Sequence, residues 1–224
     1  MKKLLVLLLI TNTLIACKKD KPTTASTPLP PPAPITDFEG NVYKTVRIGK
    51  QVWMAENLRV TKYRNGESIT KKADAVWSTK TEGYCDPVPA GTGNEYGKIY
   101  NWFAATDPRN IAPEGWRLPT EDDFKILIAY LGANSSNPLR EKGALHWESP
   151  NEGATNSTGF TAYPNPIRYT HNFEIPPLCY FWSSTPKLNS TLSSNTLTVY
   201  SDGVFIEPVA NTLGVSIRLI KITP

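Results

Sequence analysis

Six prolines stand among the eighteen residues 18–35, and they confine the folded part of this chain to residues 37–224. The other residues of the segment are mostly small or charged, so it cannot bury enough apolar surface to offset the entropy lost on ordering. Its prolines favour an extended polyproline II form instead. We therefore expect residues 17–36 to be a linker and residues 37–224 to form a single domain.

The first seventeen residues, MKKLLVLLLITNTLIAC, have the order of features found in a secretory signal. A positively charged start is followed by an apolar run, and Ala16 stands directly before Cys17. The run is too short to cross a bilayer core of about 30 Å as a helix. The ending Leu-Ile-Ala-Cys resembles the bacterial lipobox, in which the cysteine receives a diacylglycerol. We predict a signal peptide at residues 1–16 and lipidation of Cys17; an ordinary signal peptide with a chance cysteine is the alternative.

An acylated Cys17 would tether the domain to a membrane, because each buried methylene contributes roughly 0.8 kcal/mol. Lys18 and Lys19 differ from the aspartate-type signal that retains lipoproteins at an inner membrane. The expected location is therefore the cell envelope, at the outer membrane of a Gram-negative bacterium. Nucleic acid is not an expected partner, since a net charge of +4 over 224 residues offers no concentrated basic face.

The strongest helix signal lies at residues 120–132, which read TEDDFKILIAYLG. Thr120 can cap the exposed N–H groups, and the three acidic residues after it complement the positive end of the helix dipole. Gly132 supplies a left-handed stop. Apolar residues recur at helical spacing, so we expect a core-facing stripe; its members are Phe124, Leu127, Ile128 and Leu131.

Short β-rich runs with turn signals fill much of the remaining domain. Two such runs in residues 42–54 flank Gly49 and Lys50, which suit a tight hairpin turn. A second hairpin is expected to turn at residues 201–203. The further expected strands are residues 159–162, 180–183, 196–200, 204–207 and 214–222.

A second, shorter helix is expected over residues 97–105, where it would bury Ile99, Trp102 and Phe103. Two helices, many short and mainly antiparallel strands and long loops together predict an α+β domain.

Six phrases follow one another along this domain and carry a family resemblance. They are DFEGNVYKTVRIGKQVWMAENL, YGKIYNWFAA, APEGWRLPTEDDFKIL, GATNSTGFTAYP, FWSST and GVSIRLIK. In this order they resemble the Fibrobacter succinogenes major paralogous domain family over nearly all of residues 36–221. Its members look like secreted or lipid-anchored bacterial proteins of undefined activity. The phrase GWRLPTE is also similar to the formylglycine-generating family, and the resemblance implies a C-type-lectin-like fold.

Cys85 and Cys179 remain for pairing once Cys17 is acylated, in a compartment where disulfides persist. A bridge between them would stabilise the domain by roughly 4–5 kcal/mol in the chain-entropy model. Two buried thiols are the alternative. The family that the chain resembles has a cysteine after the Ser-Val-Arg of its last strand, whereas Leu219 follows Arg218 here. Cys179 is then either the compensating partner of Cys85, or the disulfide is missing.

The sequence lacks the residues that several enzyme classes need. An oxidase of the formylglycine-generating type uses a pair of thiols near its C-terminal half, and residues 159–224 hold a single cysteine. With two histidines and no H-E-x-x-H run, a zinc hydrolase lacks ligands. No G-x-S-x-G elbow or phosphate-binding glycine loop occurs either. We expect no catalytic residue, no metal and no cofactor.

Two other functions stay open. An enzyme acting on envelope polysaccharide could bring two distant carboxylates together in a cleft. Nothing in the local sequence distinguishes two of the candidates, which are Glu141, Glu148, Glu152 and Glu207. A structural envelope protein would instead carry a large flat apolar patch.

Binding through the loops is the leading interpretation. Lectin-type domains present aromatic rings with amide or carboxylate groups, which suit the apolar faces and hydroxyls of sugars. We predict contacts to a glycan or an envelope protein at Trp147, Tyr163, Asn165 and Tyr169. Packing of the loops is the alternative role for these residues. Calcium is not expected, because Pro164-Asn165-Pro166 lacks a preceding glutamate or glutamine.

Three polar residues are embedded in apolar motifs, and we predict a structural role for each because such groups usually satisfy loop backbone atoms. They are Asn57, Arg117 and Arg218.

Overall fold

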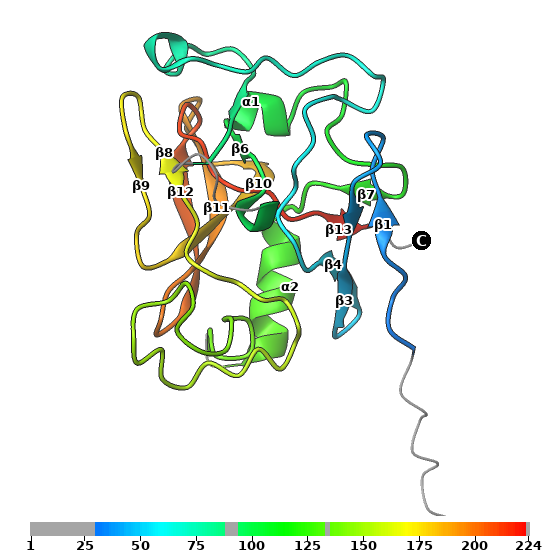
Figure 1. Cartoon of the computed structure of the whole chain (residues 1–224), viewed down its shortest axis with the longest axis vertical. Helices are drawn as coiled ribbons and strands as arrows, with labels where there is room; N and C mark the ends of the chain where they lie inside the picture. The colour runs from blue at the N-terminus through cyan, green and yellow to red at the C-terminus, as the bar shows by residue number, and fades with distance from the viewer. Residues whose placement is uncertain (1–29, 88–93, 133–134, 223–224) are drawn as a thin grey trace, which may run out of the picture. The chain divides into compact units, whose positions relative to one another are not determined.

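The computed structural model describes residues 30–87, 94–132 and 135–222. Within these ranges the compact unit Pro31–Pro224 is a mixed α+β domain with two α-helices and several small antiparallel sheets (Figure 1). The leader, Cys17 and most of the expected linker lie outside the described residues. Among the helices that are described, none has the length and apolar character needed to span a bilayer.

The first main sheet has four strands in the order β3-β4-β13-β7. Strands β3 (Thr45–Ile48) and β4 (Gln51–Met54) form the predicted hairpin. Its turn contains Gly49 at φ 59°, a conformation that strains any residue with a side chain. Strand β13 (Ile220–Lys221) comes from the C-terminus and pairs with both β4 and β7 (Trp116–Arg117).

The second main sheet is an antiparallel meander of β10 (Cys179–Pro186), β11 (Ser193–Val199) and β12 (Val204–Ala210). It contains the predicted strand at 180–183 and the predicted hairpin that turns at 201–203, so both predictions are confirmed. The register of β10 against β11 shifts between Trp182 and Pro186, where β10 carries extra residues.

Three two-stranded pairs and two short 3₁₀ turns, η1 and η2, complete the described elements. The pairs are β1 (Ile35–Thr36) with β2 (Val42–Tyr43), β5 (Tyr84–Cys85) with β6 (Ile99–Tyr100), and β8 (Ile167–Arg168) with β9 (Phe173–Glu174). The turns are Asp74–Val76 and Asn94–Tyr96. Because β1 pairs with β2, ordered structure begins before residue 37, inside the range expected to be linker.

Helix α2 (Glu121–Leu131) forms where its local signals predict it. The Thr120 side chain accepts from the Asp123 amide while the Asp123 carboxylate accepts from the Thr120 amide, and Gly132 ends the helix. Phe124 and Leu127 are buried. The helix lies between the two main sheets: it contacts β10, β11 and β12, and the Gln51 side chain of β4 donates to its first turn (Figure 1).

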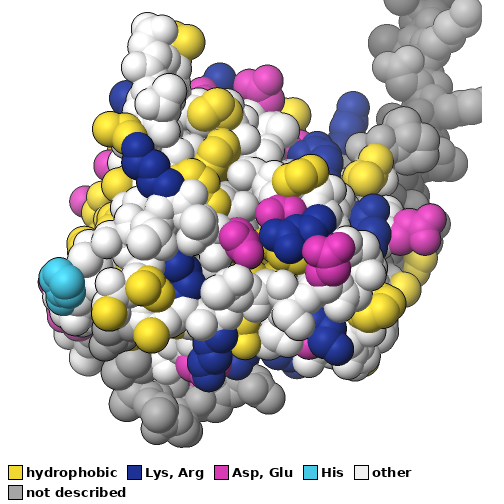
Figure 2. All heavy atoms as spheres, turned by 90° about the horizontal axis from the view of Figure 1, so that it is seen from above, with side chains coloured by type: hydrophobic (Ala, Val, Ile, Leu, Met, Phe, Trp, Pro, Cys, Tyr) yellow, Lys and Arg dark blue, Asp and Glu magenta, His cyan; other side chains and the backbone are white. Residues whose placement is uncertain are grey.

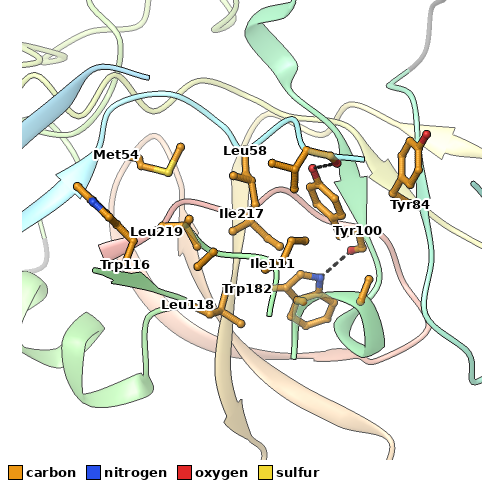
Figure 3. Packing of buried hydrophobic residues seen from close by; sticks show 14 of the residues in the cluster. Met54, Leu58, Tyr84, Tyr100, Ile111, Trp116, Leu118, Trp182, Ile217 and Leu219 are labelled. Atoms are coloured by element: carbon orange, nitrogen blue, oxygen red, sulfur yellow. Dashed lines mark hydrogen bonds between the residues drawn. The ribbon is translucent and has the colours of Figure 1, made fainter. Parts of the chain in front are cut away.

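The interior divides into two main hydrophobic clusters. Strand β4 is buried on both faces, and its side chains alternate between the clusters. Val52 and Met54 join a first cluster with Trp182 and Leu219, whereas Trp53 joins a second cluster around α2. In the first cluster the Trp182 indole donates to the Tyr100 carbonyl at 2.8 Å (Figure 3). The buried Trp182 N–H therefore has a partner inside an otherwise apolar cluster.

The helix expected over 97–105 is wrong in its first half. Ile99–Tyr100 is strand β6, and Tyr100 exchanges two backbone hydrogen bonds with Val215 at 3.0 Å. Helix α1 (Trp102–Ala105) begins only after Asn101, whose side chain accepts from the Ala104 amide. Pairing with a distant segment has overridden the local helical pattern.

Two expected strands are also corrected. Residues 159–162 form no strand, because Gly159 and Thr161 both have positive φ angles, of 70° and 56°. Residues 214–222 are extended, but only Ile220–Lys221 is part of a sheet. The rest of the segment makes single bridges to different partners, which prevents one regular ladder; these partners are Tyr100, Arg168 and Phe181.

The Asp123 carboxylate allows a test of the α2 start. Burial alone would raise its pKa, but hydrogen bonds from Arg117 and Thr120 outweigh burial, so the pKa lies below its ordinary value. We expect Asp123→Asn to lower the free energy of unfolding at pH 7 by about 1–3 kcal/mol. The wild-type advantage should be complete above the unfolded pKa of about 3.9 and should disappear as the pH falls through the lower folded-state pKa.

Urea denaturation at pH 7 and pH 3 measures this difference. Asp122→Asn is the matched control, since Asp122 occupies the same turn with a largely exposed side chain. Equal losses for the two variants at pH 7 would contradict the assigned role of Asp123.

Candidate functional site

A cleft of about 510 Å³ opens among three segments of the loop-rich region. Its walls are residues 147–152, 177–178 and 200–201, and Arg140 lies at its base. We call this the loop cleft. The second of these segments leads into β10, and the third follows directly after β11, so the cleft is built against one end of the second main sheet.

The wall formed by residues 147–152 is fixed through the backbone of Ala162. The Ala162 carbonyl accepts from the Trp147 indole at 2.9 Å and from the Glu141 amide at 2.8 Å. The Ala162 amide donates to the Leu139 carbonyl at 2.7 Å. Both ends of the 139–147 loop are thereby attached to one residue, although no regular secondary structure holds them.

Arg140 is 1% exposed and lies against the Trp147 ring, with its guanidinium carbon 5.3 Å from the ring centroid. It donates to the Asn137 side chain, the Asn151 side chain and the Glu152 carbonyl. These hydrogen bonds hold the base of the cleft and the loop above it together.

The polar groups on the cleft walls differ in their charge and in whether they already have a hydrogen-bond partner. The Tyr200 hydroxyl donates to Glu207 at 2.8 Å, and burial together with this bond raises the pKa of Tyr200 to about 12. Its hydroxyl is therefore neutral at physiological pH. Glu148 and Glu152 are exposed, and neither carboxylate has a hydrogen bond or ion pair with another described residue.

The four glutamates considered for catalysis are thus separated. Glu207 holds Tyr200, and the Glu141 carboxylate lies 2.9 Å from His146 Nδ1, where it accepts a hydrogen bond in the tautomer that carries its proton on that nitrogen. The His146 ring stacks on Tyr163 with a centroid distance of 4.7 Å. Only Glu148 and Glu152 line the loop cleft.

The aromatic residues predicted to contact ligand are mostly packing residues. Trp147 is 4% exposed and presents only part of its ring to the loop cleft. Tyr163 is 7% exposed, donates its hydroxyl to the Glu95 carbonyl, and lines a different cleft of about 430 Å³ beside Pro32 and Pro34. Tyr169 is half-buried and packs against the first cluster.

Asn165 is buried and satisfies the backbone of β10. Its amide nitrogen donates to the Tyr180 carbonyl, and its amide oxygen accepts from the Tyr180 amide, both at 3.0 Å. The structure therefore does not gather the four predicted residues into one site, since Trp147 alone of them lines the loop cleft. The cleft residues that the sequence did not single out are Arg140, Ser149, Pro150, Asn151, Pro177, Leu178, Tyr200 and Ser201.

The structural roles predicted for three polar residues are confirmed. Asn57 is 1% exposed, donates to the Tyr96 carbonyl and accepts from Arg218 Nε at 2.8 Å. Arg117 pairs with Asp123 through both terminal nitrogens. Arg218 donates its remaining nitrogens to the carbonyls of Phe160 and Thr161.

The disulfide considered between Cys85 and Cys179 is not formed. Cys179 is a thiol in the second cluster, whereas Cys85 lies in a small separate cluster with Trp77 and Ile99. Burial raises the pKa of the Cys179 thiol, so it is protonated at neutral pH. Leu219, which stands where the resembling family has a cysteine, is fully buried in the first cluster.

The surface charge is mixed on the face that Figure 2 shows, where lysine and arginine side chains lie next to aspartates and glutamates. Among the ion pairs of the described residues, Arg109 pairs with Glu67, Glu82 and Asp107. Within the described ranges no group of three or more His, Cys, Asp or Glu side chains is arranged to hold a metal ion.

The comparisons with known proteins give one match. The model of the Fibrobacter succinogenes major domain matches residues 46–221, from β3 to β13. This range contains both main sheets and every residue that lines the loop cleft. No curated protein and no solved structure matches the chain.

The role of Asn165 can be tested by stability. We expect Asn165→Ala to lower the free energy of unfolding by about 2–4 kcal/mol, because it leaves a buried amide and a buried carbonyl of β10 without partners. Thermal or urea denaturation measures the loss. Asn172→Ala, at an exposed asparagine of the neighbouring loop, is the control and should change stability by less than about 0.5 kcal/mol. Loss of ligand binding at unchanged stability would instead return Asn165 to the binding residues.

Proposed function

The chain belongs to the Fibrobacter succinogenes major domain family, and with this membership as premise we propose that it is a non-enzymatic, lipid-anchored protein of the cell envelope. Its loops bind a glycan or a protein ligand in the loop cleft. The lining of that cleft is the observation that carries the proposal.

The lining suits recognition of hydroxyl-rich or amide-rich ligands. The Tyr200 ring and the edge of Trp147 supply apolar surface, and Pro177 and Leu178 add to it. Ser201 lines the same opening and carries a hydroxyl group, and Asn151, whose amide bonds Arg140 and the carbonyls of Glu141 and Gly143, lies beside it in the lining. A small number of polar groups set into a mainly apolar, concave surface is the usual composition of a ligand site.

The placement of the acids supports binding over hydrolysis. Glycoside hydrolysis needs carboxylates on both sides of the scissile bond. Glu148 and Glu152 come from a single loop, and the other segments that line the cleft contribute Pro177, Leu178, Tyr200 and Ser201, none of them acidic. An enzyme acting on envelope polysaccharide remains the second candidate, because these two glutamates do share one cleft.

The proposal extends to fold and location. Helix α2 packed between small antiparallel sheets, with a long irregular region between α2 and β10, supports a C-type-lectin-like arrangement. The leader ending in Cys17 supports an acyl anchor at the outer membrane of a Gram-negative bacterium. The mixed charges on the face that Figure 2 shows support the expectation that nucleic acid is not a partner.

Filling the cleft tests the binding role. We expect Ser201→Trp to abolish binding of the detergent-solubilised full chain to ligands detected on glycan arrays and envelope-protein arrays, because the indole occupies the opening. Ser78→Trp, at another exposed serine outside the cleft, should bind as the wild type does. An equal response of both variants, or release of reducing sugar ends by the wild-type chain, would contradict the proposal.

The anchor has an independent test. Cys17→Ser removes the thiol that accepts the lipid, so we expect the protein to move from the membrane fraction to the soluble fraction. Mass spectrometry of the wild-type product should show acyl chains on an N-terminal cysteine. A wild-type product without acyl chains, or a variant that stays with the membrane, would refute lipid anchoring.

A further inference from the structure

Arg140 is an unusual group to find at the base of an open cleft. It is 1% exposed, and its three hydrogen bonds all end on uncharged oxygens, those of Asn137, Asn151 and Glu152. Its Nε–H is buried and has no hydrogen-bond partner among the residues that the structure describes. A buried cation without an anionic partner is costly, since its attraction to neutral oxygens does not replace full hydration.

Arg218 is a second buried arginine of this domain, and all of its donor nitrogens have acceptors. Arg218 is equally buried and also lacks a carboxylate partner, yet each of its three nitrogens donates to an oxygen. Its guanidinium carbon also lies near the rings of Phe160 and Phe181, at 4.6 and 5.2 Å from their centroids. Arg140 differs in two respects: one donor has no acceptor, and the residue lines a cleft.

From this contrast we propose that the loop cleft binds acidic glycans, and that a sugar carboxylate is the missing anionic partner of Arg140. The inference rests on the proposed function and specifies its ligand class. The Asn151 side chain lines the cleft, is half-buried, accepts from Arg140 and donates to the carbonyls of Glu141 and Gly143. A ligand carboxylate that replaces the Asn151 amide oxygen exchanges a neutral acceptor for a charged one, which strengthens the hydrogen bond.

The glutamates at the rim do not reverse this preference. Glu148 and Glu152 are exposed, so water and salt screen their charges, whereas the charge of Arg140 acts from a medium of lower dielectric constant. They do oppose an incoming anion at longer range. Removing them should therefore strengthen the binding of an acidic glycan and weaken the binding of a cationic one, which makes the rim a probe of the ligand's charge.

The experiment compares matched ligands on the detergent-solubilised full chain. The probes are a panel of oligouronides of different linkage, each paired with its carboxyl-reduced, neutral counterpart. We expect at least one oligouronide to bind about tenfold more tightly than its neutral partner. Glu148→Gln combined with Glu152→Gln should raise the affinity for that oligouronide, and Glu114→Gln, at an exposed glutamate outside the cleft, should leave it unchanged.

Arg140→Gln tests the arginine itself. The ratio of acidic to neutral affinity should fall toward one while binding of the neutral partner persists, a change that general loosening of the loop does not produce. If this variant does not fold, the oligouronide affinity of the double variant Glu148→Gln, Glu152→Gln tests the inference instead. Equal affinities for acidic and neutral partners, weaker oligouronide binding after rim neutralisation, or binding of acidic peptides with no oligouronide bound would each overturn the inference.

Failure of the inference is distinguishable from failure of the proposed function. Neutral glycans or proteins that bind the wild type and are blocked by Ser201→Trp would leave the binding role intact and remove only the acidic preference. A wild-type chain that binds no member of either array would remove both.

Discussion

The arrangement of the loops depends on the guanidinium of Arg218, buried where the C-terminal segment passes through the domain. Each of its nitrogens donates to an oxygen: that of Asn57 after β4, or the carbonyls of Phe160 and Thr161. Burial lowers the pKa of Arg218, because a site away from water disfavours the charged form. The segment on either side continues this role. Val215 pairs with β6, and Ile220 pairs with both β4 and β7.

This attachment reaches the loop cleft through a short series of contacts. Arg218 fixes the carbonyls of Phe160 and Thr161, and the next residue, Ala162, accepts from the Trp147 indole. Trp147 in turn packs under the Arg140 guanidinium. A wall without regular secondary structure is thus positioned from the core. Such preorganisation matters for binding, because a loop that is already ordered loses less conformational entropy when a ligand arrives.

How much of this the sequence predicts depends on whether the determining contacts are local. Helix α2 was predictable because Thr120, its acidic first turn and Gly132 act within a few residues of one another. Strand β6 was not, because its pairing with Val215 is invisible in its own helical pattern. Trp147 was predicted as a ligand contact, and the structure places it in the wall of the loop cleft with most of its ring buried. Nothing in the local sequence distinguished Arg140, because the residues that bury it and accept its hydrogen bonds are brought together only when the loops fold.

The two arginines show how one residue type serves framework and site in the same domain. A guanidinium has five donors in a fixed fork, so its fit depends on how many oxygens the fold places around it. Around Arg218 the fold supplies an acceptor to every nitrogen, so the residue links three segments and has a purely structural role. Around Arg140 the described residues leave Nε–H without an acceptor, and the residue lines the cleft. Because a buried guanidinium with only neutral partners is costly, a ligand that brings a carboxylate to Arg140 gains binding free energy from the charged acceptor.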